Sequence, residues 1–244
     1  MKRCPYSEMG SILFLKMKEE KFQNIWGRIG GRETGNTTGK SNQEGLNMVT
    51  LKESITKENL LRAFAGECQA WRRYEFAASQ AKNQNLEVLY WLFHYTGQQE
   101  KEHAEIFYNH LREFNGQEIT IDAGYPIDHS SDLQELLKLA AQHEAAEHDT
   151  IYKSFGDKAK EEGFSNIANS FYMIAEIEEV HSQRFTRYAN LVQNNRLFDN
   201  ETPTEYICLN CGHVHNGAKA PQVCPVCSHN QGFFVRRDDS PFGR

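Results

Sequence analysis

The sequence predicts a mainly α-helical protein, a four-helix bundle followed by a small metal-binding module. Apolar residues recur every three or four positions in four segments between Thr56 and Asn195, and each segment carries glutamate on its apolar face. Four cysteines form two CxxC pairs near the C-terminus. A chain of 244 residues with 39% hydrophobic content can bury one large core and a small second one.

Charge and hydropathy exclude two classes of partner. A net charge of -6, with no Lys/Arg cluster interleaved with aromatic residues, argues against nucleic acid. The sequence has no run of about 18 apolar residues, which excludes a transmembrane helix. The apolar stretch that follows Met1 is short and lacks a cleavage site, so we expect a cytoplasmic protein that binds neither nucleic acid nor membrane.

The chain is expected to divide into five parts. Residues 1–48 are rich in glycine and lack sustained periodicity, so we expect a disordered and dispensable extension. Residues 49–195 should form the bundle, 196–205 a polar linker, 206–236 the cysteine module and 237–244 a tail. Functional residues are therefore sought in the bundle and in the cysteine module.

Four helices are expected, over residues 57–82, 86–114, 131–161 and 165–193. The first and third connections are short, so the helices that they join should be antiparallel neighbours. The middle connection, 115–130, contains glycine and proline and is long enough, at about 3.3 Å per residue, to run the length of the bundle. One long crossover between two helical hairpins is typical of ferritin-like bundles.

Carboxylates interrupt the inward stripe of every predicted helix near its middle. The stripes contain Glu67, Glu100, His103, Glu144, Glu147, Glu178 and His181. The third stripe also runs on to Ile151. Unpaired buried carboxylates are strongly destabilising, so this core requires cations. Oxygen ligands with two imidazoles suit iron or manganese, and inward glutamates with two Glu-x-x-His pairs are the ligand set of dimetal bundles.

The spacing of these residues repeats between the two hairpins. Glu67 precedes Glu100 by 33 residues, and Glu144 precedes Glu178 by 34, which predicts two half-sites related by a pseudo-twofold axis. A single Glu-x-x-His pair in a charged helix is usually solvated, and Glu100 itself lies in a charged run. The joint placement of four positions on four inward faces favours the metal site.

Two CxxC knuckles, Cys208 to Cys211 and Cys224 to Cys227, are separated by twelve residues. This spacing predicts a tetrahedral site of four thiolates. Zn(II) and iron fit such a site equally, so the residues leave open both a structural zinc ribbon and an iron centre. The other two cysteines are expected to be free thiols.

These motifs, in this order, resemble the rubrerythrin family over residues 51–235. The matching segments are Phe64-Ala-Gly-Glu67-Cys-Gln-Ala70, Glu100-Lys-Glu-His103-Ala104, Glu144-x-x-Glu147, Glu178-x-x-His181 and the paired knuckles. The resemblance implies a ferritin-like bundle with a diiron site and a rubredoxin-like Fe(Cys)4 domain, which favours iron at the cysteines. It also implies a homodimer in which the Fe(Cys)4 centre of one subunit serves the diiron site of its partner.

The resemblance implies a role for each ligand. Glu100 and Glu178 would bridge the two iron ions. Glu67 and His181 would be terminal ligands, and Glu144 would bind the iron next to His181.

Four residues would take part in the reaction. By the resemblance, His103 and Glu147 would be exchangeable ligands of one iron that moves on oxidation. Tyr74 and Tyr152 match tyrosines that line the family's site and would hydrogen-bond to ligands; packing in the core is the alternative.

Three positions depart from the family's pattern. Cys68 stands where serine is common, His148 replaces an aromatic residue, and Lys153 replaces a proline. No ligand is lost, but changes around a metal site alter its potential, rate and sensitivity to oxidation.

The sequence therefore predicts a non-haem diiron peroxidase for defence against oxidative stress. Hydrogen peroxide needs two electrons and two protons to become two waters, and the Fe(Cys)4 centre would relay the electrons. A nicotinamide-binding motif is lacking in the sequence, so the donor should be another protein, such as a rubredoxin or an NAD(P)H-dependent reductase. The alternatives are a ferroxidase that handles iron and a scaffold protein with structural zinc.

Overall fold

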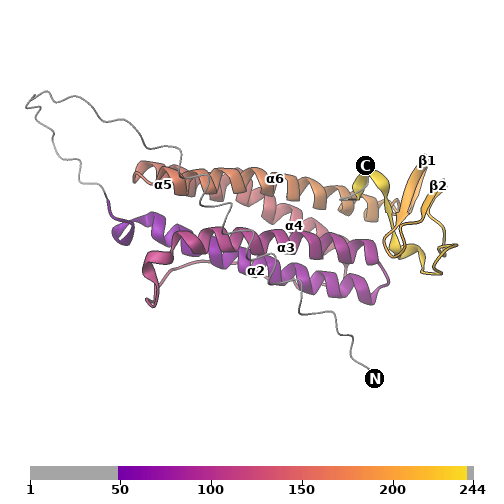
Figure 1. Ribbon diagram of the computed structural model, residues 1–244, viewed down its shortest axis with the longest axis horizontal. Helices are drawn as coiled ribbons and strands as arrows, with labels where there is room; N and C mark the ends of the chain where they lie inside the picture. The colour runs from indigo at the N-terminus through magenta and orange to yellow at the C-terminus, as the bar shows by residue number, and fades with distance from the viewer. Residues whose placement is uncertain (1–48, 241–244) are drawn as a thin grey trace, which may run out of the picture. The chain divides into compact units, whose positions relative to one another are not determined.

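The structure is a computed structural model that describes residues 49–240. The predicted disordered extension, 1–48, and the end of the predicted tail lie outside the described residues. The described part forms a helical bundle followed by a small module of three strands (Figure 1). The predicted fold class is confirmed.

Five helices build the bundle, because the third predicted helix is divided by a π-helical turn. The helices are α2 (Ile55–Asn83), α3 (Glu87–His110), α4 (Leu133–Ala146), α5 (Tyr152–Glu161) and α6 (Ser165–Gln193), and the π-turn is Glu147–Ile151. α2 packs mainly against α3, and α4 and α5 pack against α6, as the short connections predicted. None of the helices between residues 49 and 240 combines the length and the apolar character needed to cross a bilayer.

Three helices are followed closely by a residue in the left-handed conformation. Asn85 (φ 59°), Gly163 (φ 92°) and Asn195 (φ 55°) follow α2, α5 and α6. The residue after each donates its backbone N–H to a carbonyl of the last helical turn, at 3.0, 2.8 and 2.7 Å respectively. This closure satisfies the carbonyl groups that a helix end leaves unpaired.

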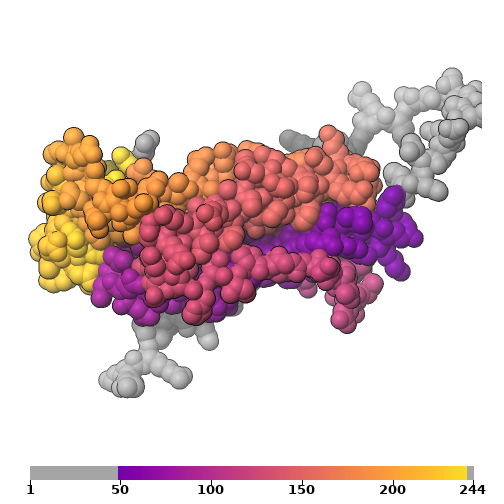
Figure 2. Space-filling view, turned by 180° about the vertical axis from the view of Figure 1, so that it is seen from behind, coloured from indigo at the N-terminus to yellow at the C-terminus, as the bar shows by residue number. Residues whose placement is uncertain are grey.

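The crossover between the two hairpins begins earlier than predicted. α3 ends at His110 rather than near Phe114, and a short 3-10 turn, Arg112–Phe114, follows it. The chain then runs without helix or strand to Ser130, and Figure 2 shows this segment, in pink, on the face of the bundle turned to the viewer. The predicted connectivity of two hairpins joined by one long crossover is confirmed.

Side-chain contacts fasten the crossover to the bundle. The hydroxyl of Tyr125 donates to the carbonyl of Arg62 at 2.9 Å. Asp128 forms an ion pair with Arg73 and lies 3.1 Å from Nε2 of His143. The segment is therefore tied to both helical hairpins.

The C-terminal module is a three-stranded antiparallel sheet. Its strands are β1 (Asp199–Cys208), β2 (Val214–Lys219) and β3 (Phe234–Arg236), in the order β2-β1-β3. β1 begins inside the predicted linker, 196–205, because Asp199 already pairs with Lys219 across the sheet. Part of the predicted tail is a 3-10 turn, Arg237–Asp239.

Two apolar clusters fill the bundle. One includes Leu89, Phe93 and Phe185, and the other includes Leu60, Phe107 and Phe171. Along each helix the inward glutamates lie between these two clusters. The bundle thus has a charged layer in its middle and apolar halves on either side.

Candidate metal centres

Six of the seven predicted bundle ligands meet in this charged layer. Each is at most 4% exposed. One group contains Glu67, Glu100, His103 and Glu178, and a second contains Glu100, Glu144, Glu178 and His181. Within each group the ligand atoms lie within 4.8 Å of one another. Glu100 and Glu178 belong to both groups, and a carboxylate with two oxygens is suited to bridge two ions.

The two histidines face opposite oxygens of the shared carboxylates. Nδ1 of His103 lies 3.0 Å from Oε2 of Glu100 and 3.0 Å from Oε1 of Glu178. Nδ1 of His181 lies 2.9 Å from Oε1 of Glu100 and 2.8 Å from Oε2 of Glu178. The half-sites inferred from the internal repeat therefore face one another.

Glu147 lies apart from both groups. It is the first residue of the π-turn and is partly accessible to solvent. The expectation that Ile151 continues the inward stripe is wrong: Ile151 is 37% exposed, whereas Tyr152 is 1% exposed. The π-turn adds one residue to the helical register, so the next inward position is Tyr152 rather than Ile151.

The tyrosines predicted at the site each contact a carboxylate of the opposite hairpin. Tyr74 donates its hydroxyl proton to Glu144, and Tyr152 donates to Glu67 at 2.6 Å. Tyr74 follows Glu67 by seven residues, but Tyr152 follows Glu144 by eight. The π-turn accommodates the additional residue and lets both tyrosines occupy equivalent places.

Aromatic rings close the charged layer on both sides. Tyr74, Phe93 and Phe185 form one cluster with ring centroids 5.0 to 6.1 Å apart, and Tyr152, Phe107 and Phe171 form the other, at 4.9 to 6.0 Å. These clusters exclude water, so charges between them interact more strongly than they would in solvent.

Burial and mutual contact shift the pKa values of the site. Burial, together with the carboxylate of Glu100, raises the pKa of Glu144 to about 8. Burial opposes charge on His103, but the adjacent carboxylates of Glu100 and Glu178 raise its pKa to about 9. The same two carboxylates and Glu144 raise the pKa of His181 to about 12 against the effect of burial. Without metal, the folded site therefore retains protons.

The donor atoms fit a pair of cations. Buried side-chain atoms that lack a hydrogen-bond partner in the described residues include Glu67 Oε2, Glu100 Oε1, Glu144 Oε2, both carboxylate oxygens of Glu178 and His181 Nδ1. Buried polar atoms are ordinarily satisfied, and carboxylates this close repel one another. Two divalent ions held by oxygen and imidazole would satisfy both requirements.

The four cysteines form a separate centre in the C-terminal module. Sγ of Cys208 lies 3.7 Å from Sγ of Cys227, and Sγ of Cys211 lies 3.7 Å from Sγ of Cys224. Four sulfurs at about 2.3 Å from a central ion would be about 3.8 Å apart in a tetrahedron. The predicted cysteines therefore form a tetrahedral thiolate site.

The two knuckles have the same backbone geometry. Gly212 and Ser228 both adopt positive φ, 76° and 61°, and their N–H groups donate to the carbonyls of the first cysteine of each knuckle at 2.8 and 2.9 Å. The backbone N–H of His229 lowers the pKa of Cys227 to about 6, which favours its thiolate. Burial instead raises the pKa of Cys208 to about 12, so without a cation the folded loops favour the thiolate only at Cys227 among these two cysteines.

The departures from the family's pattern lie around the bundle site. Nζ of Lys153 lies 3.0 Å from Nε2 of His148, so two of the three departures contact each other. Nε2 of His148 also lies 3.9 Å from a carboxylate oxygen of each of the exposed Glu176 and Glu179. Cys68 is partly buried, and burial raises the pKa of its thiol.

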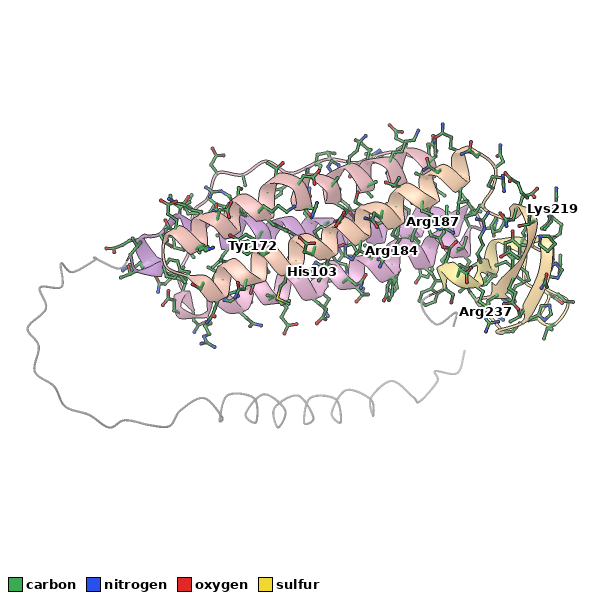
Figure 3. The ribbon with its side chains drawn as sticks, turned by 90° about the horizontal axis from the view of Figure 1, so that it is seen from above. His103, Tyr172, Arg184, Arg187, Lys219 and Arg237 are labelled. Atoms are coloured by element: carbon green, nitrogen blue, oxygen red, sulfur yellow. The ribbon has the colours of Figure 1, made fainter. Side chains whose placement is uncertain are left out.

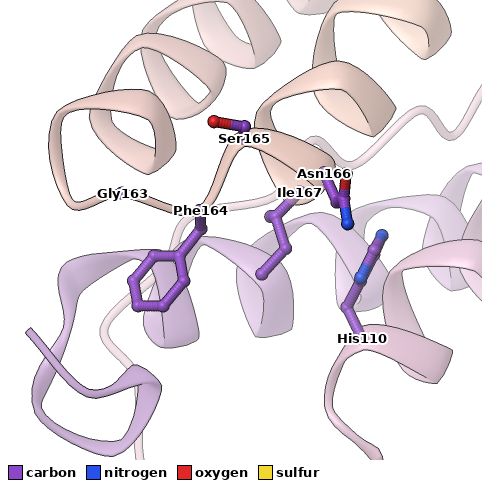
Figure 4. Close-up of a pocket in the computed structure, with 6 residues that line it drawn as sticks. All are labelled: His110, Gly163, Phe164, Ser165, Asn166 and Ile167. Atoms are coloured by element: carbon purple, nitrogen blue, oxygen red, sulfur yellow. The ribbon is translucent and has the colours of Figure 1, made fainter. Parts of the chain in front are cut away.

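Surface hollows lie outside the ligand groups. One of about 410 Å³ is lined by His110 and residues 163–167 (Figure 4). Another of about 410 Å³ reaches the ring of Tyr74 but none of the carboxylate ligands. The site is therefore defined by its buried donors rather than by an open pocket.

One polar contact of the bundle site was not predicted. Oε1 of Gln99 lies 3.1 Å from Nε2 of His181, on the side of the ring away from the carboxylates. In the sequence, Gln99 belongs to a charged run beside Glu100 and shows no periodic signal. The contact depends on how α3 and α6 pack.

Comparison with known proteins gives the same assignment for both parts of the chain. A rubrerythrin family model matches residues 58–190, and a rubrerythrin, rubredoxin-like domain model matches residues 206–235. Rubrerythrin of Clostridium perfringens is 39% identical over 77% of this chain and 96% of its own length. Rubrerythrin of Porphyromonas gingivalis is 38% identical over 76% of this chain and 91% of its own length.

Solved structures of nigerythrin are also similar. A partially reduced state matches with a TM-score of 0.51 and 26% identity, covering 84% of this chain and 100% of its own. A fully reduced, all-ferrous state matches with a TM-score of 0.51 and 25% identity over the same shares. The two family models, the buried Glu/His groups and the four-cysteine module all indicate the same family. The chain therefore belongs to the rubrerythrin family.

Proposed function

We propose that the chain is a non-haem iron peroxidase that reduces hydrogen peroxide to water in defence against oxidative stress. Glu67, Glu100, His103, Glu144, Glu178 and His181 would hold two iron ions, and Cys208, Cys211, Cys224 and Cys227 a third. When bound, iron would supply the electrons that cleave the O–O bond. The observation that carries the proposal is that a double carboxylate site and a separate thiolate site occur in one chain. A storage protein has no need of the second site.

The protein's own residues would prepare the bundle site for this reaction. Tyr74 and Tyr152 orient the terminal carboxylates Glu144 and Glu67 by donating hydrogen bonds to them. Both phenols retain their protons at neutral pH, because burial and the neighbouring carboxylates raise their pKa values. Their place in the aromatic clusters keeps water from the carboxylates.

Glu147 and His103 would exchange as ligands during turnover. Glu147 follows Glu144 by three residues, and burial and the charge of Glu144 raise its pKa. A fifth carboxylate stabilises a pair of ions more strongly as their charge rises from +4 to +6. Binding of Glu147 would thus favour the oxidised site and make the reduced site the better electron donor.

The cysteine module would accept electrons from outside. Cys211 is exposed, and Cys227 is partly exposed, so a donor protein can approach the thiolates closely. We infer that the donor is a rubredoxin or an NAD(P)H-dependent reductase. The family's arrangement supports a cytoplasmic homodimer in which this module serves the bundle site of the partner.

Peroxide titration of the reduced, iron-loaded protein tests the proposal. We expect one peroxide to withdraw two electrons, and the visible absorption of Fe(Cys)4 to return as electrons pass to the bundle site. Peroxide consumption should continue while a chemical reductant supplies electrons. A colourless protein that binds zinc at the cysteines would contradict the proposal.

The variant Cys211→Ser provides the matched control. It leaves the bundle intact, so a single oxidation by peroxide should persist, whereas repeated turnover with an electron-donor protein should be lost. If the iron-loaded protein instead accumulated Fe(III) with dioxygen and consumed no peroxide, the chain would be a ferroxidase.

A further inference from the structure

The two histidines of the bundle site are supported differently. Nε2 of His181 faces the oxygen of Gln99 at 3.1 Å. Within residues 49–240, no hydrogen bond to Nε2 of His103 is formed; only its Nδ1 has polar neighbours. The internal repeat allows direct comparison, because the position equivalent to Gln99 in the other half is Ile177. One half-site therefore has a polar support that the other lacks.

Arg184 extends this asymmetry. It follows His181 by three residues, and the equivalent position after His103 is Ile106, which is 41% exposed. Figure 3 labels Arg184 and His103 within the bundle. Both polar residues of the support, Gln99 and Arg184, are thus isoleucine in the other half of the repeat.

Arg184 holds Gln99 in place. Its Nη1 donates to Oε1 of Gln99 and to Oγ1 of Thr96, each at 2.9 Å. Thr96 is fully buried and donates its own proton to the carbonyl of Leu92 at 3.0 Å, so its oxygen is free to accept. The guanidinium carbon also lies 5.4 Å from the centre of the Tyr95 ring, where cation–π attraction stabilises it.

Which groups donate and which accept in these hydrogen bonds determines which ring nitrogen of His181 carries a proton. Arginine has only donors, so the amide atom of Gln99 that faces Arg184 must be the oxygen. The same oxygen faces Nε2 of His181, which must therefore carry a proton. Nδ1 is then the nitrogen that would give up its proton and offer its lone pair when a metal binds. A flipped amide would direct its NH2 group at two donors.

We propose that Arg184 is a positioning residue that, through Gln99, fixes the ring and the tautomer of His181. Within the described residues of one chain, Nε2 of His103 lacks such a support. The inference rests on the proposed function only in requiring that these residues bind metal, and it does not depend on peroxide reduction. The two half-sites thus differ because one contains Gln99 and Arg184 and the other contains isoleucine at both equivalent positions.

Two variants of the full chain test the proposal. Arg184→Met removes the donor and lets the Gln99 amide flip. Adding Gln99→Glu to Arg184→Met should reverse the effect, because a carboxylate has no donor end to turn towards His181. A residue with a merely structural role would not be rescued in this way.

The measurements use protein loaded with Zn(II), which is diamagnetic. Nitrogen–proton correlation spectra of the histidine rings report the tautomer of His181 and the exchange of its Nε2 proton, and competition with a chelator reports metal affinity. In the Arg184→Met variant we expect proton exchange at least about tenfold faster and affinity about tenfold weaker, the range found when support of a ligating histidine is lost. The double variant should return both towards the wild-type values.

Three outcomes would overturn the proposal. Wild-type spectra and affinity in Arg184→Met would show that Arg184 does not position His181. Failure of the double variant to recover, or loss of helical circular dichroism in both variants, would show that Arg184 acts on the fold instead. Wild-type protein that binds zinc in the bundle but, when loaded with iron instead, does not reduce peroxide would refute the proposed function and leave this inference standing.

Discussion

Glu147 is the predicted bundle ligand that lies outside both groups of metal-binding side chains. We expect Glu147→Ala to lower peroxide turnover at least about tenfold while changing iron affinity less, because six ligands remain. Steady-state turnover and chelator competition would measure the two effects. The matched control is Glu161→Ala, at a side chain that is 71% exposed on α5. Unchanged turnover in Glu147→Ala would contradict the exchange of ligands.

The raised pKa values in the bundle site predict how the stability of the metal-free protein depends on pH. Folding raises the pKa of Glu144 to about 8 and that of His103 to about 9, above the ordinary values of about 4.3 and 6.5. The folded state then binds more protons than the unfolded state, so stability falls as pH rises, by about 1.4 kcal/mol per pH unit for each extra proton. Glu100, whose pKa is lowered to about 2 by His181 and His103 despite burial, acts in the opposite sense only at acidic pH.

Thermal unfolding of metal-free and iron-loaded protein between pH 5.5 and about 8.5 tests this expectation, since the window lies between the unfolded and folded pKa values. The melting temperature of the metal-free protein should fall across this range. Bound iron replaces the protons, so the stabilisation by iron should grow with pH. A metal-free melting temperature that stayed constant or rose would refute the pKa shifts.

At the residue scale, the buried carboxylates and histidines were predictable and the side chains around them were not. Glu67 and Glu178 interrupt apolar stripes, and a carboxylate on an inward face is visible in the sequence itself. Gln99 and Arg184 lie at positions that look like an ordinary charged helix surface. Their function arises only when α3 and α6 pack together.

At the scale of elements, the π-turn is the feature that periodicity missed. Ile151 and Tyr152 are both apolar, so either could continue the stripe, and the sequence alone favoured Ile151. Comparison of the two halves contains the signal, because the tyrosine follows its glutamate by seven residues in one half and by eight in the other. One inserted residue shifts the register without breaking the helical pattern on either side.

Deletion of Thr150, an exposed residue of the π-turn, tests its role. The shortened segment should form a continuous α-helix that still directs Tyr152 inward, so we expect retained helicity and metal binding. Glu147 would lose the local geometry that sets it apart from the other carboxylates, and turnover should fall about tenfold or more. Thr150→Ala, which keeps the chain length, should behave as wild type. Full turnover after the deletion would refute a role for the π-turn.

At the scale of the whole molecule, the C-terminal module is seated on the bundle. Val235 of β3 belongs to the apolar cluster that contains Leu89, and Leu197 and Phe198 pack against the same cluster. Arg187 on α6 forms an ion pair with Asp239 at 2.7 Å. The segment 196–205 was predicted as a polar linker, and its two apolar residues, Leu197 and Phe198, pack against the core.

A substitution at Gly232 tests whether the C-terminal module is held against the bundle. A Cβ atom there would lie 1.8 Å from the carbonyl oxygen of Asn85, in the turn between α2 and α3. We expect Gly232→Ala to force the module away from the turn and to lower stability by about 1–3 kcal/mol, the usual effect of overpacking. Denaturant unfolding and amide exchange in the α2–α3 turn would measure it.

The control for this variant is Gly124→Ala in the crossover, where a Cβ atom would meet no heavy atom within 4 Å. It should leave stability unchanged. The visible absorption of the Fe(Cys)4 centre should also persist in Gly232→Ala, because the knuckles are not altered. Wild-type stability and exchange in Gly232→Ala would show that the contact with Asn85 is not maintained in solution.

The contact between Gly232 and Asn85 has a consequence for kinetics. A module seated at this turn does not diffuse on a tether, so no swinging motion precedes each electron transfer. Solvent viscosity, which slows the rotation of loosely attached domains, should then leave the rate of internal electron transfer unchanged. Packing at this turn fixes the position of the thiolate site on its own bundle, so in the proposed homodimer the subunit interface alone would set its distance from the bundle site of the partner.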